Sequence, residues 1–222
     1  MDAPLAPPRA TFVNLPRDRQ ESLLRAAVAE FAEQGFQRAS VNNIVRTLGI
    51  AKGSLYQYFD NKEALFLHVF DHFSDTVKQQ VRQAVSAADP NLFQAIRAVL
   101  LAGIEFIDRH PDYFRLYLRV LTESGTPRRE ELLARVHLFS RDYFSPLCEA
   151  ARVAGLLHPE VPIATAVFLI DAAVERFLQT YAQPLLDSGL GLAAMDPGGL
   201  AREIDIIIRV LRHGLCPRSQ GE

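Results

Sequence analysis

The sequence has little of what marks a disulfide-bonded, metal-binding or membrane-spanning chain. It has no tryptophan and only two cysteines, Cys148 and Cys216, in 222 residues. Two cysteines are too few for a disulfide framework or a cysteine-based zinc site. The longest apolar stretch, residues 164–174, is interrupted by Asp171, so no membrane span is expected. The first residues lack the pattern of a secretory signal, and we expect a soluble, cytoplasmic protein without metal or cofactor.

The chain also lacks an excess of either charge. It carries 24 Lys and Arg against 26 Asp and Glu, and this balance alone counts mildly against nucleic-acid binding. The charges are unevenly placed, because residues 1–62 hold eight basic and six acidic side chains and residues 63–222 hold sixteen and twenty. The near-neutral total therefore combines a mildly basic N-terminal part with an acidic remainder.

Strand-like alternation is absent, and apolar residues recur at helical spacing almost throughout the chain. Stretches with this spacing cover residues 17–35, 41–48, 52–59, 62–85, 91–109, 111–123, 127–154, 162–183 and 199–214. Proline and glycine residues separate these stretches. We predict an all-α fold of about nine helices. It would comprise a flexible N-terminal arm (1–15), a three-helix domain (16–62) and a helical bundle (63–222).

The run from Ser40 to Lys62 contains two short helical stretches around a turn at Gly49. Such a turn makes the two helices cross steeply, so the second can project from the surface. Leu55 and Phe59 are four residues apart and share the inner face of this second helix. The outward positions are then Lys52, Gly53, Tyr56 and Gln57. Long donors beside a small residue suit a DNA groove, although helix pairs of this kind also occur in bundles that bind no DNA.

The stretch from Pro16 to Phe70 resembles the N-terminal domain of the TetR family of bacterial transcription regulators. The matching residues are Phe31, Gly35-Phe36, Ser40-Val41, Ile44, Leu48-Gly49-Ile50, Lys52 to Phe59 and Asn61 to Leu65. The departures are Ala39, Asn43, Val45 and Ala51. Ala51 stands where the family often has a serine that caps the recognition helix, and this loss costs about 1 kcal/mol of local helix stability.

The resemblance implies a helix-turn-helix, without a wing, whose second helix enters the major groove. By this resemblance the base edges would be met by Lys52, Gly53, Tyr56 and Gln57, with help from Asn42. The phosphates would be held by Ser40, Ser54, Tyr58 and Lys62. These roles agree with chemistry, because hydroxyls and lysines suit phosphate and amides suit adenine.

Beyond Gln80 the resemblance fades, and the family implies a domain that binds a small-molecule effector. The candidate effector-binding residues are Phe106, Tyr113, Phe114, Tyr117, His137, Arg141, Phe144, Phe168, Asp171 and Glu175. The aromatic members could line an apolar cavity, and the charged members could meet a charged group of the effector. Ordinary core packing and salt bridges between helices, such as Arg141 with Asp171, are the alternatives.

The last two helical stretches are apolar on more than one side, which indicates packing partners on more than one side. The family implies that this pair forms a four-helix bundle with its two-fold mate. The candidate dimer residues are Val167, Ile170, Val174, Phe177, Leu178, Ile204, Ile207, Ile208 and Leu211. A homodimer would present two recognition helices to a pseudo-palindromic operator.

Together these features predict a ligand-responsive DNA-binding regulator, and we expect a repressor that a small, largely apolar effector releases from double-stranded DNA. A DNA-binding activator and a regulator without a ligand remain alternatives. An all-α enzyme that uses the C-terminal pocket is disfavoured, because no nucleophile–base pair, metal spacing or phosphate loop supports it. His68 and His72 share a helical face, but a pair of this kind on a long helix is more often a surface feature than a metal site.

Overall fold

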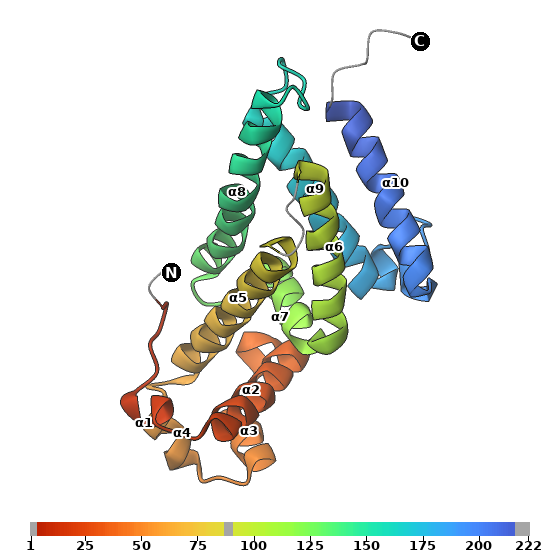
Figure 1. The fold of residues 1–222 in the computed structure, drawn as a ribbon. Coiled ribbons are helices and arrows are strands. Elements are labelled where there is room, and N and C mark those ends of the chain that lie inside the picture. Colours follow the sequence, from red (N-terminus) through yellow and green to blue (C-terminus); the bar gives the residue numbers. More distant parts are fainter. Residues whose placement is uncertain (1–3, 87–90, 216–222) are drawn as a thin grey trace, which may run out of the picture. The chain divides into compact units, whose positions relative to one another are not determined.

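The computed structural model describes residues 4–86 and 91–215, without the side chains of Ser86 and residues 137–140 (Figure 1). This part of the chain forms α-helices, two short 3₁₀ turns and no strand, which confirms the all-α prediction. The helices are α1 (Ala10–Val13), α2 (Arg17–Arg38), α3 (Val41–Leu48), α4 (Lys52–Tyr58), α5 (Lys62–Ser86), α6 (Leu92–Arg109), α7 (Pro111–Thr122), α8 (Arg129–Val153), α9 (Ile163–Ala182) and α10 (Pro197–Leu215). None of these helices is both long and apolar enough to cross a membrane.

The helix ends follow the glycines and caps of the sequence. Gly49 ends α3 in the left-handed conformation (φ 64°), and Asn61 accepts the Ala64 N–H at 2.8 Å near the start of α5. The helical stretch expected to end at Gly35 does leave the helical conformation there (φ 69°, ψ 168°), and a kink separates it from the last residues of α2, up to Arg38. Ser40 directly precedes α3, but its side chain makes no cap.

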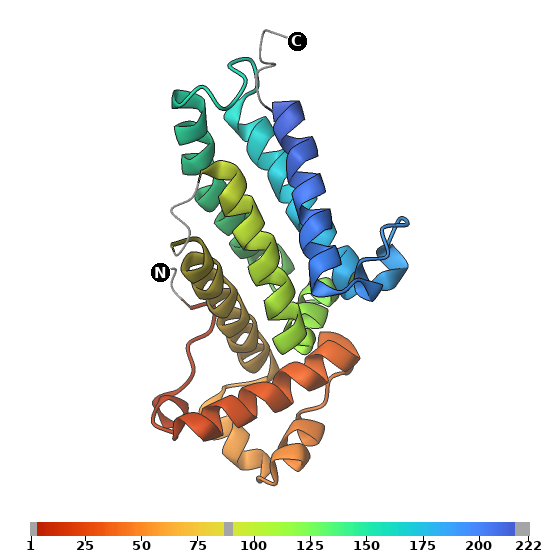
Figure 2. The same cartoon turned by 45° about the vertical axis from the view of Figure 1, so that its right-hand side comes forward.

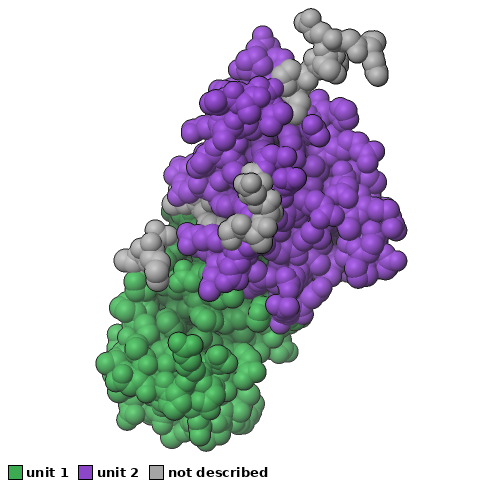
Figure 3. Space-filling view, in the orientation of Figure 1, with its two compact units in different colours: residues 1–76, 110–135 green, residues 77–109, 136–222 purple. Residues whose placement is uncertain are grey.

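The chain divides into two compact units (Figure 3). Unit 1 comprises residues 1–76 and 110–135, and unit 2 comprises residues 77–109 and 136–222. The boundary expected between residues 62 and 63 does not coincide with this division. The unit that contains the helix-turn-helix also contains the first part of α5, all of α7 and the start of α8.

Unit 1 is built around an aromatic core under α2 and α3. The rings of Phe31 and Phe66 meet edge to face with centroids 5.0 Å apart, and Phe36 packs against Phe66 at 5.2 Å. Phe31 and Phe66 are almost fully buried. These rings pack α2 against α5, and α2 also contacts α3 and α7.

Unit 2 contains a separate core to which α5, α6, α8, α9 and α10 contribute buried residues. Helices α6, α9 and α10 contact one another, and Figure 2 shows them side by side. Gly103 permits a close approach of α6 to α9, because a Cβ there would lie 2.7 Å from the methyl groups of Leu178. Cys148 is fully buried in this core, and burial raises the pKa of its thiol to about 11. A thiol with so high a pKa is an ordinary packing residue rather than a nucleophile.

Candidate nucleic-acid interface

Helices α3 and α4 form the predicted helix-turn-helix. The inner face of α3 is buried through Val41, Ile44 and Val45, and the left-handed Gly49 turns the chain toward α4. A side chain at φ 64° would be strained, so glycine suits this turn. The geometry places both short helices on unit 1 with their inner faces fixed.

Helix α4 is anchored by its apolar side and presents polar residues outward. Leu55 and Phe59 are each 2% exposed, whereas Tyr56 is 39% exposed. Three further positions of the predicted base-reading set, Lys52, Gly53 and Gln57, are exposed as well. A Cβ on Gly53 would meet nothing within 4 Å, so this backbone is open to a close approach from outside.

The remaining predicted DNA contacts differ in how far they reach solvent. Asn42 is exposed on α3, and Ser54 and Tyr58 are half-buried on α4. Ser40 is also half-buried, and its backbone N–H donates to Glu30 Oε1 at 2.7 Å. Glu30 accepts from Asn43 Nδ2 as well, at 3.2 Å, so this carboxylate holds the start of α3. Glu30 was missed from the sequence because ten residues separate it from Ser40.

Lys62, which was predicted to hold a phosphate, makes its contacts within the protein in this structure. Its ammonium donates to the carbonyls of Phe36 at 2.8 Å, Gln37 at 3.2 Å and Ala39 at 3.1 Å. An ammonium has three donors, so all of them are taken by the end of α2. Lys62 therefore holds α2 against α5, and a direct phosphate contact is not available to it in this conformation.

A second cation lies at the bend of α2. Arg119 on α7 donates to the carbonyls of Ala32 and Glu33 and pairs with Glu123. A Cβ on Gly35 would lie 2.9 Å from Cδ of Glu123, so the bend brings the helix backbone close to this carboxylate. Carbonyls freed by the bend thus receive donors from α7, as those at the helix end receive donors from α5.

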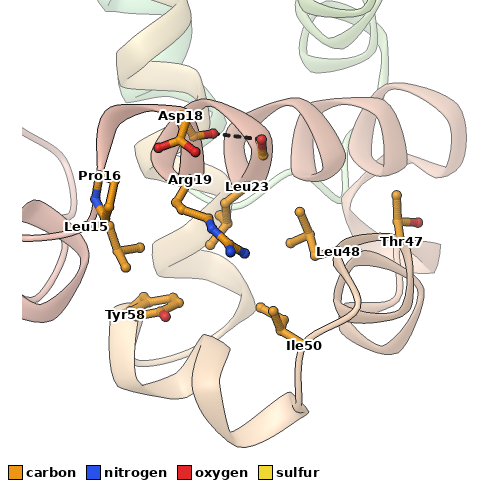
Figure 4. A pocket seen from close by; sticks show the side chains of 10 residues that line it. Leu15, Pro16, Asp18, Arg19, Leu23, Thr47, Leu48, Ile50 and Tyr58 are labelled. Atoms are coloured by element: carbon orange, nitrogen blue, oxygen red, sulfur yellow. Dashed lines mark hydrogen bonds between the residues drawn. The ribbon is translucent and has the colours of Figure 1, made fainter.

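A hollow of about 620 Å³ opens beside the helix-turn-helix (Figure 4). Arg19 and Leu23 of α2 lie along one side, and Ile50 of the turn lies opposite them. Tyr58, at the end of α4, and Leu15, just before α2, close the hollow at one end. The tyrosine ring therefore borders open space where α2 passes over α4.

Comparison with known proteins shows which proteins this helix-turn-helix and its chain resemble. Residues 23–69 match the family described as "Bacterial regulatory proteins, tetR family". The transcriptional activator FasR of Mycolicibacterium smegmatis is 36% identical over 136 residues, which are 54% of this chain and 62% of the relative. The transcriptional repressor KstR2 of Rhodococcus jostii is 26% identical over 170 residues, or 76% and 83% of the two chains.

A solved structure extends the match to nearly the whole chain. The crystal structure of a TetR family transcriptional regulator from Chloroflexus aurantiacus is 26% identical, with a TM-score of 0.70. The match covers 96% of this chain and 100% of that one. Residues 23–69 therefore form a TetR-family DNA-binding domain, and the chain resembles TetR-family transcriptional regulators over nearly its whole length.

The candidate effector-binding residues are divided between the two units. Tyr113, Phe114 and Tyr117 are buried in unit 1, where Tyr113 stacks on Phe73 with centroids 6.0 Å apart. The members that fall in unit 2 are Phe106, Arg141, Phe144, Phe168, Asp171 and Glu175. His137 lies outside the residues whose side chains are described.

Two members of this set differ from expectation. Phe168 is 68% exposed and therefore lines no cavity within its own unit. Arg141 is exposed and approaches Asp142 at 3.4 Å, not Asp171. A hollow of about 290 Å³ in unit 2 is lined instead by residues of α6 and α10, among them Arg97 and Arg212.

The predicted dimer residues lie mostly inside unit 2. Val167, Ile170, Val174, Phe177 and Ile204 are all 9% exposed or less. The other members, Leu178, Ile207, Ile208 and Leu211, are half-buried. These side chains fill the chain's own core, so a partner chain cannot reach the buried five. The exposed apolar residues of the same helices are Phe168, Leu169, Ile206 and Val210.

Proposed function

We propose that this TetR-family regulator is a repressor that binds a pseudo-palindromic operator as a homodimer and is released by a small, largely apolar effector. The observation that carries the proposal is the surface of α4. Four exposed positions, Lys52, Gly53, Tyr56 and Gln57, lie over an inner face fixed by buried Leu55 and Phe59. A rigid helix with an open glycine and long donors has the shape and chemistry that a major groove accepts.

Lys52, Gly53 and Gln57, three of the exposed positions of α4, have distinct roles in this proposal. The amide of Gln57 can pair in a bidentate way with an adenine edge, and the ammonium of Lys52 can donate to guanine. The open backbone at Gly53 allows the helix to approach the groove floor. The half-buried hydroxyls of Ser54, Tyr58 and Ser40 flank this face and suit phosphate contacts, and exposed Asn42 on α3 can help to read base edges.

Dimer formation is proposed through the exposed side of α9 and α10. Phe168 and Leu169 are 68% and 41% exposed on α9, and Ile206 and Val210 are 46% and 66% exposed on α10. The two helices contact each other within unit 2, so these four residues belong to adjoining elements. A second copy with the same surface would bury them by two-fold symmetry and supply the second recognition helix.

Release by an effector is proposed to act through differential affinity. An effector lowers operator affinity only if it binds the DNA-incompetent state more tightly than the competent one. Helix α5 runs unbroken from Lys62 to Ser86, with residues to Thr76 in unit 1 and the rest in unit 2. It is therefore one of the direct covalent routes between the DNA-reading unit and the unit that carries the α9–α10 surface, as is α8, which crosses the same division.

Binding-site selection from a random duplex library tests the proposal. The wild-type chain is expected to enrich a two-fold symmetric sequence, and Gln57→Ala is expected to change the preferred base at one position in each half-site. Gln79→Ala removes an exposed glutamine of α5 in unit 2 and serves as the matched control. Failure of the wild-type chain to enrich any sequence would overturn the proposal.

The sign of regulation is tested separately with the selected site placed in a reporter promoter. A repressor lowers reporter output when the wild-type chain is present, and Gln57→Ala restores it. The relatives FasR and KstR2 are an activator and a repressor respectively, so the promoter experiment distinguishes two outcomes that both occur among proteins similar to this one. Increased output would establish an activator.

A further inference from the structure

The N-terminal segment before α2 contacts the end of the recognition helix. Sequence patterning predicted a flexible arm over residues 1–15, and the family match begins only at residue 23. Within the described residues of this segment, Ala10–Val13 form the short helix α1, which contacts α4. The contact therefore involves residues that precede the stretch matched by the family model.

Two donors of the arm satisfy carbonyls in the last turn of α4. The backbone N–H of Arg9 donates to the Tyr58 carbonyl at 3.0 Å, and the hydroxyl of Thr11 donates to the Gln57 carbonyl. The last four carbonyls of a helix have no partner within it, so each outside donor stabilises that end. At the other end of α4, Ala51 gives no side-chain cap.

The need for outside support follows from the length of α4. The helix has seven residues, and helices shorter than about 12 residues are marginal by themselves in water. The hollow in Figure 4 lies beside Tyr58 where α2 passes over the helix, so packing is missing on that flank. The arm supplies contacts at this end of α4.

An aromatic anchor holds α1 in place. Phe12 is 3% exposed, and its ring packs against Phe59 with centroids 5.0 Å apart and against His68 at 5.2 Å. Phe59 directly follows α4 and is itself buried. The point at which the recognition helix ends is thus packed between α1 and α5.

The arm is also fastened ahead of α1 and after it. The Leu5 N–H donates to Asp71 Oδ2 at 2.7 Å, and the Leu5 carbonyl accepts from Arg128 Nη1 at 2.7 Å. After α1, Gln20 Nε2 donates to the carbonyls of Val13 at 3.1 Å and Leu15 at 2.9 Å. Because the segment is held at both ends, it can keep the end of α4, which it contacts, in a fixed position.

We propose that residues 5–15 form a brace that sets the orientation of the recognition helix, with Thr11 and Phe12 as its positioning residues. The proposal rests on the function proposed for α4. The brace touches the backbone of Gln57 and Tyr58 rather than DNA, so it governs how well the base-reading face fits its operator. Attraction to phosphates, which does not require an accurate fit, is independent of it.

Thr11→Val tests the brace with the smallest change, because valine keeps the shape and removes the donor. Operator affinity is expected to fall about fivefold to tenfold, the effect of one hydrogen bond. Affinity for a scrambled duplex and the salt dependence of binding are expected to stay unchanged. Thr11→Ser keeps the donor and should restore operator affinity. An equal loss on both duplexes, or no loss on the operator, would overturn the proposal.

Arg9→Gln distinguishes a brace from a DNA-contacting arm. The Arg9 side chain pairs with Asp60, its Nε lying 2.7 Å from Oδ1, and both are exposed. The salt slope of operator binding is expected to match that of the wild type. A slope smaller by about 1 would mean that Arg9 neutralises a phosphate, and it would overturn the proposal that the arm acts only through α4.

Hydrogen exchange of the free protein tests the brace without DNA. Amides of residues 52–58 are expected to exchange faster in Thr11→Val than in the wild type and Thr11→Ser, while α6 in unit 2 is unchanged. Unchanged exchange in α4 would overturn the brace even if an operator exists. Faster exchange in α4, together with a wild-type chain that selects no sequence, would support the brace and defeat the proposed function alone.

Discussion

Lys62 interacts with Phe36 through both the ring and the backbone of that residue. The ammonium lies 4.6 Å from the ring centroid and donates to the Phe36 carbonyl at 2.8 Å. The same ammonium also donates to two further carbonyls at the end of α2. A cation placed at the C-terminus of one helix by the first residue of another fixes the two helices against each other.

Lys62→Met should therefore reduce stability rather than phosphate attraction. Hydrogen bonds to a charged group contribute about 1.5–3 kcal/mol, and the free energy of unfolding is expected to fall by about that amount. Urea denaturation measures the loss, and the salt slope of DNA binding is expected to remain that of the wild type.

Lys52→Met provides the matched control, because Lys52 is exposed at the start of α4. The free energy of unfolding of this variant should lie within about 0.5 kcal/mol of the wild-type value, and the salt slope of its DNA binding should be smaller by about 1. If Lys62→Met lowered the slope and left stability intact, the phosphate role expected from the sequence would be right and the helix-holding role wrong.

Replacement of Gly35 by any other residue is predicted to destabilise the fold, for two reasons that can be tested separately. Its backbone, at φ 69° and ψ 168°, lies in a region that is almost exclusive to glycine and costs an alanine about 1–3 kcal/mol, and a Cβ would lie 2.9 Å from Cδ of Glu123. Gly35→Ala should therefore lower the free energy of unfolding by more than about 2 kcal/mol, as measured by urea denaturation.

The two causes can be separated with a double variant. Glu123→Ala removes the carboxylate that a Cβ would meet, and it also removes the partner of Arg119. In the Glu123→Ala background, Gly35→Ala should cost only the conformational part, about 1–3 kcal/mol. An equal cost in both backgrounds would show that the close approach to Glu123 contributes nothing.

The spacing of apolar residues was sufficient to predict the helix-turn-helix, but it did not predict the contacts that hold its helices in place. Leu55 and Phe59 are four residues apart, and their spacing alone gives the inner face of α4. The acceptors of Lys62 lie 23 to 26 residues away, and the acceptors of the arm lie more than 40 residues away. Contacts that depend on tertiary folding leave no periodic signal in one sequence.

The candidate dimer residues on α9 illustrate a second limit of prediction from the sequence. Periodicity identified apolar residues on more than one side but could not say which side faces the chain's own core. Ile170, at 0% exposed, was taken for the interface, and Phe168, at 68% exposed, was taken for a cavity. Only the packing of α9 against α6 and α10 assigns the two sides.

Acid should destabilise the fold through His68. Burial, followed by the neighbouring His72, lowers the pKa of His68 from 6.5 to about 4. Between these values the unfolded chain takes up a proton that the folded chain does not, so stability falls as pH falls through this window. The full loss is about 3 kcal/mol near pH 4.

His68→Phe keeps an aromatic ring beside Phe12 and Phe59 and removes the proton. Its unfolding free energy should fall less than that of the wild type between pH 7 and pH 5 in urea titrations. Asp71, whose pKa burial raises, changes stability in the opposite direction in both proteins, so the comparison at equal pH isolates His68. An identical decrease in the two proteins would contradict the assignment.

Charge placed on the exposed side of α9 and α10 should separate a dimer without unfolding the chain. Phe168 and Val210 are 68% and 66% exposed, so Phe168→Glu with Val210→Glu disturbs little of the core. Two unpaired carboxylates on each copy would have to be buried on association, which is strongly unfavourable. The wild type should sediment as a dimer at micromolar concentration and the double variant as a monomer.

Operator binding links this surface to function, because a monomer engages one half-site. The double variant should lose about 10²-fold or more in operator affinity while keeping its helical circular dichroism. Val153→Glu is the matched control, since Val153 is 91% exposed at the end of α8 and lies outside both helices. A double variant that remains dimeric, or a control that also dissociates, would place the two-fold contact on a different surface of the chain.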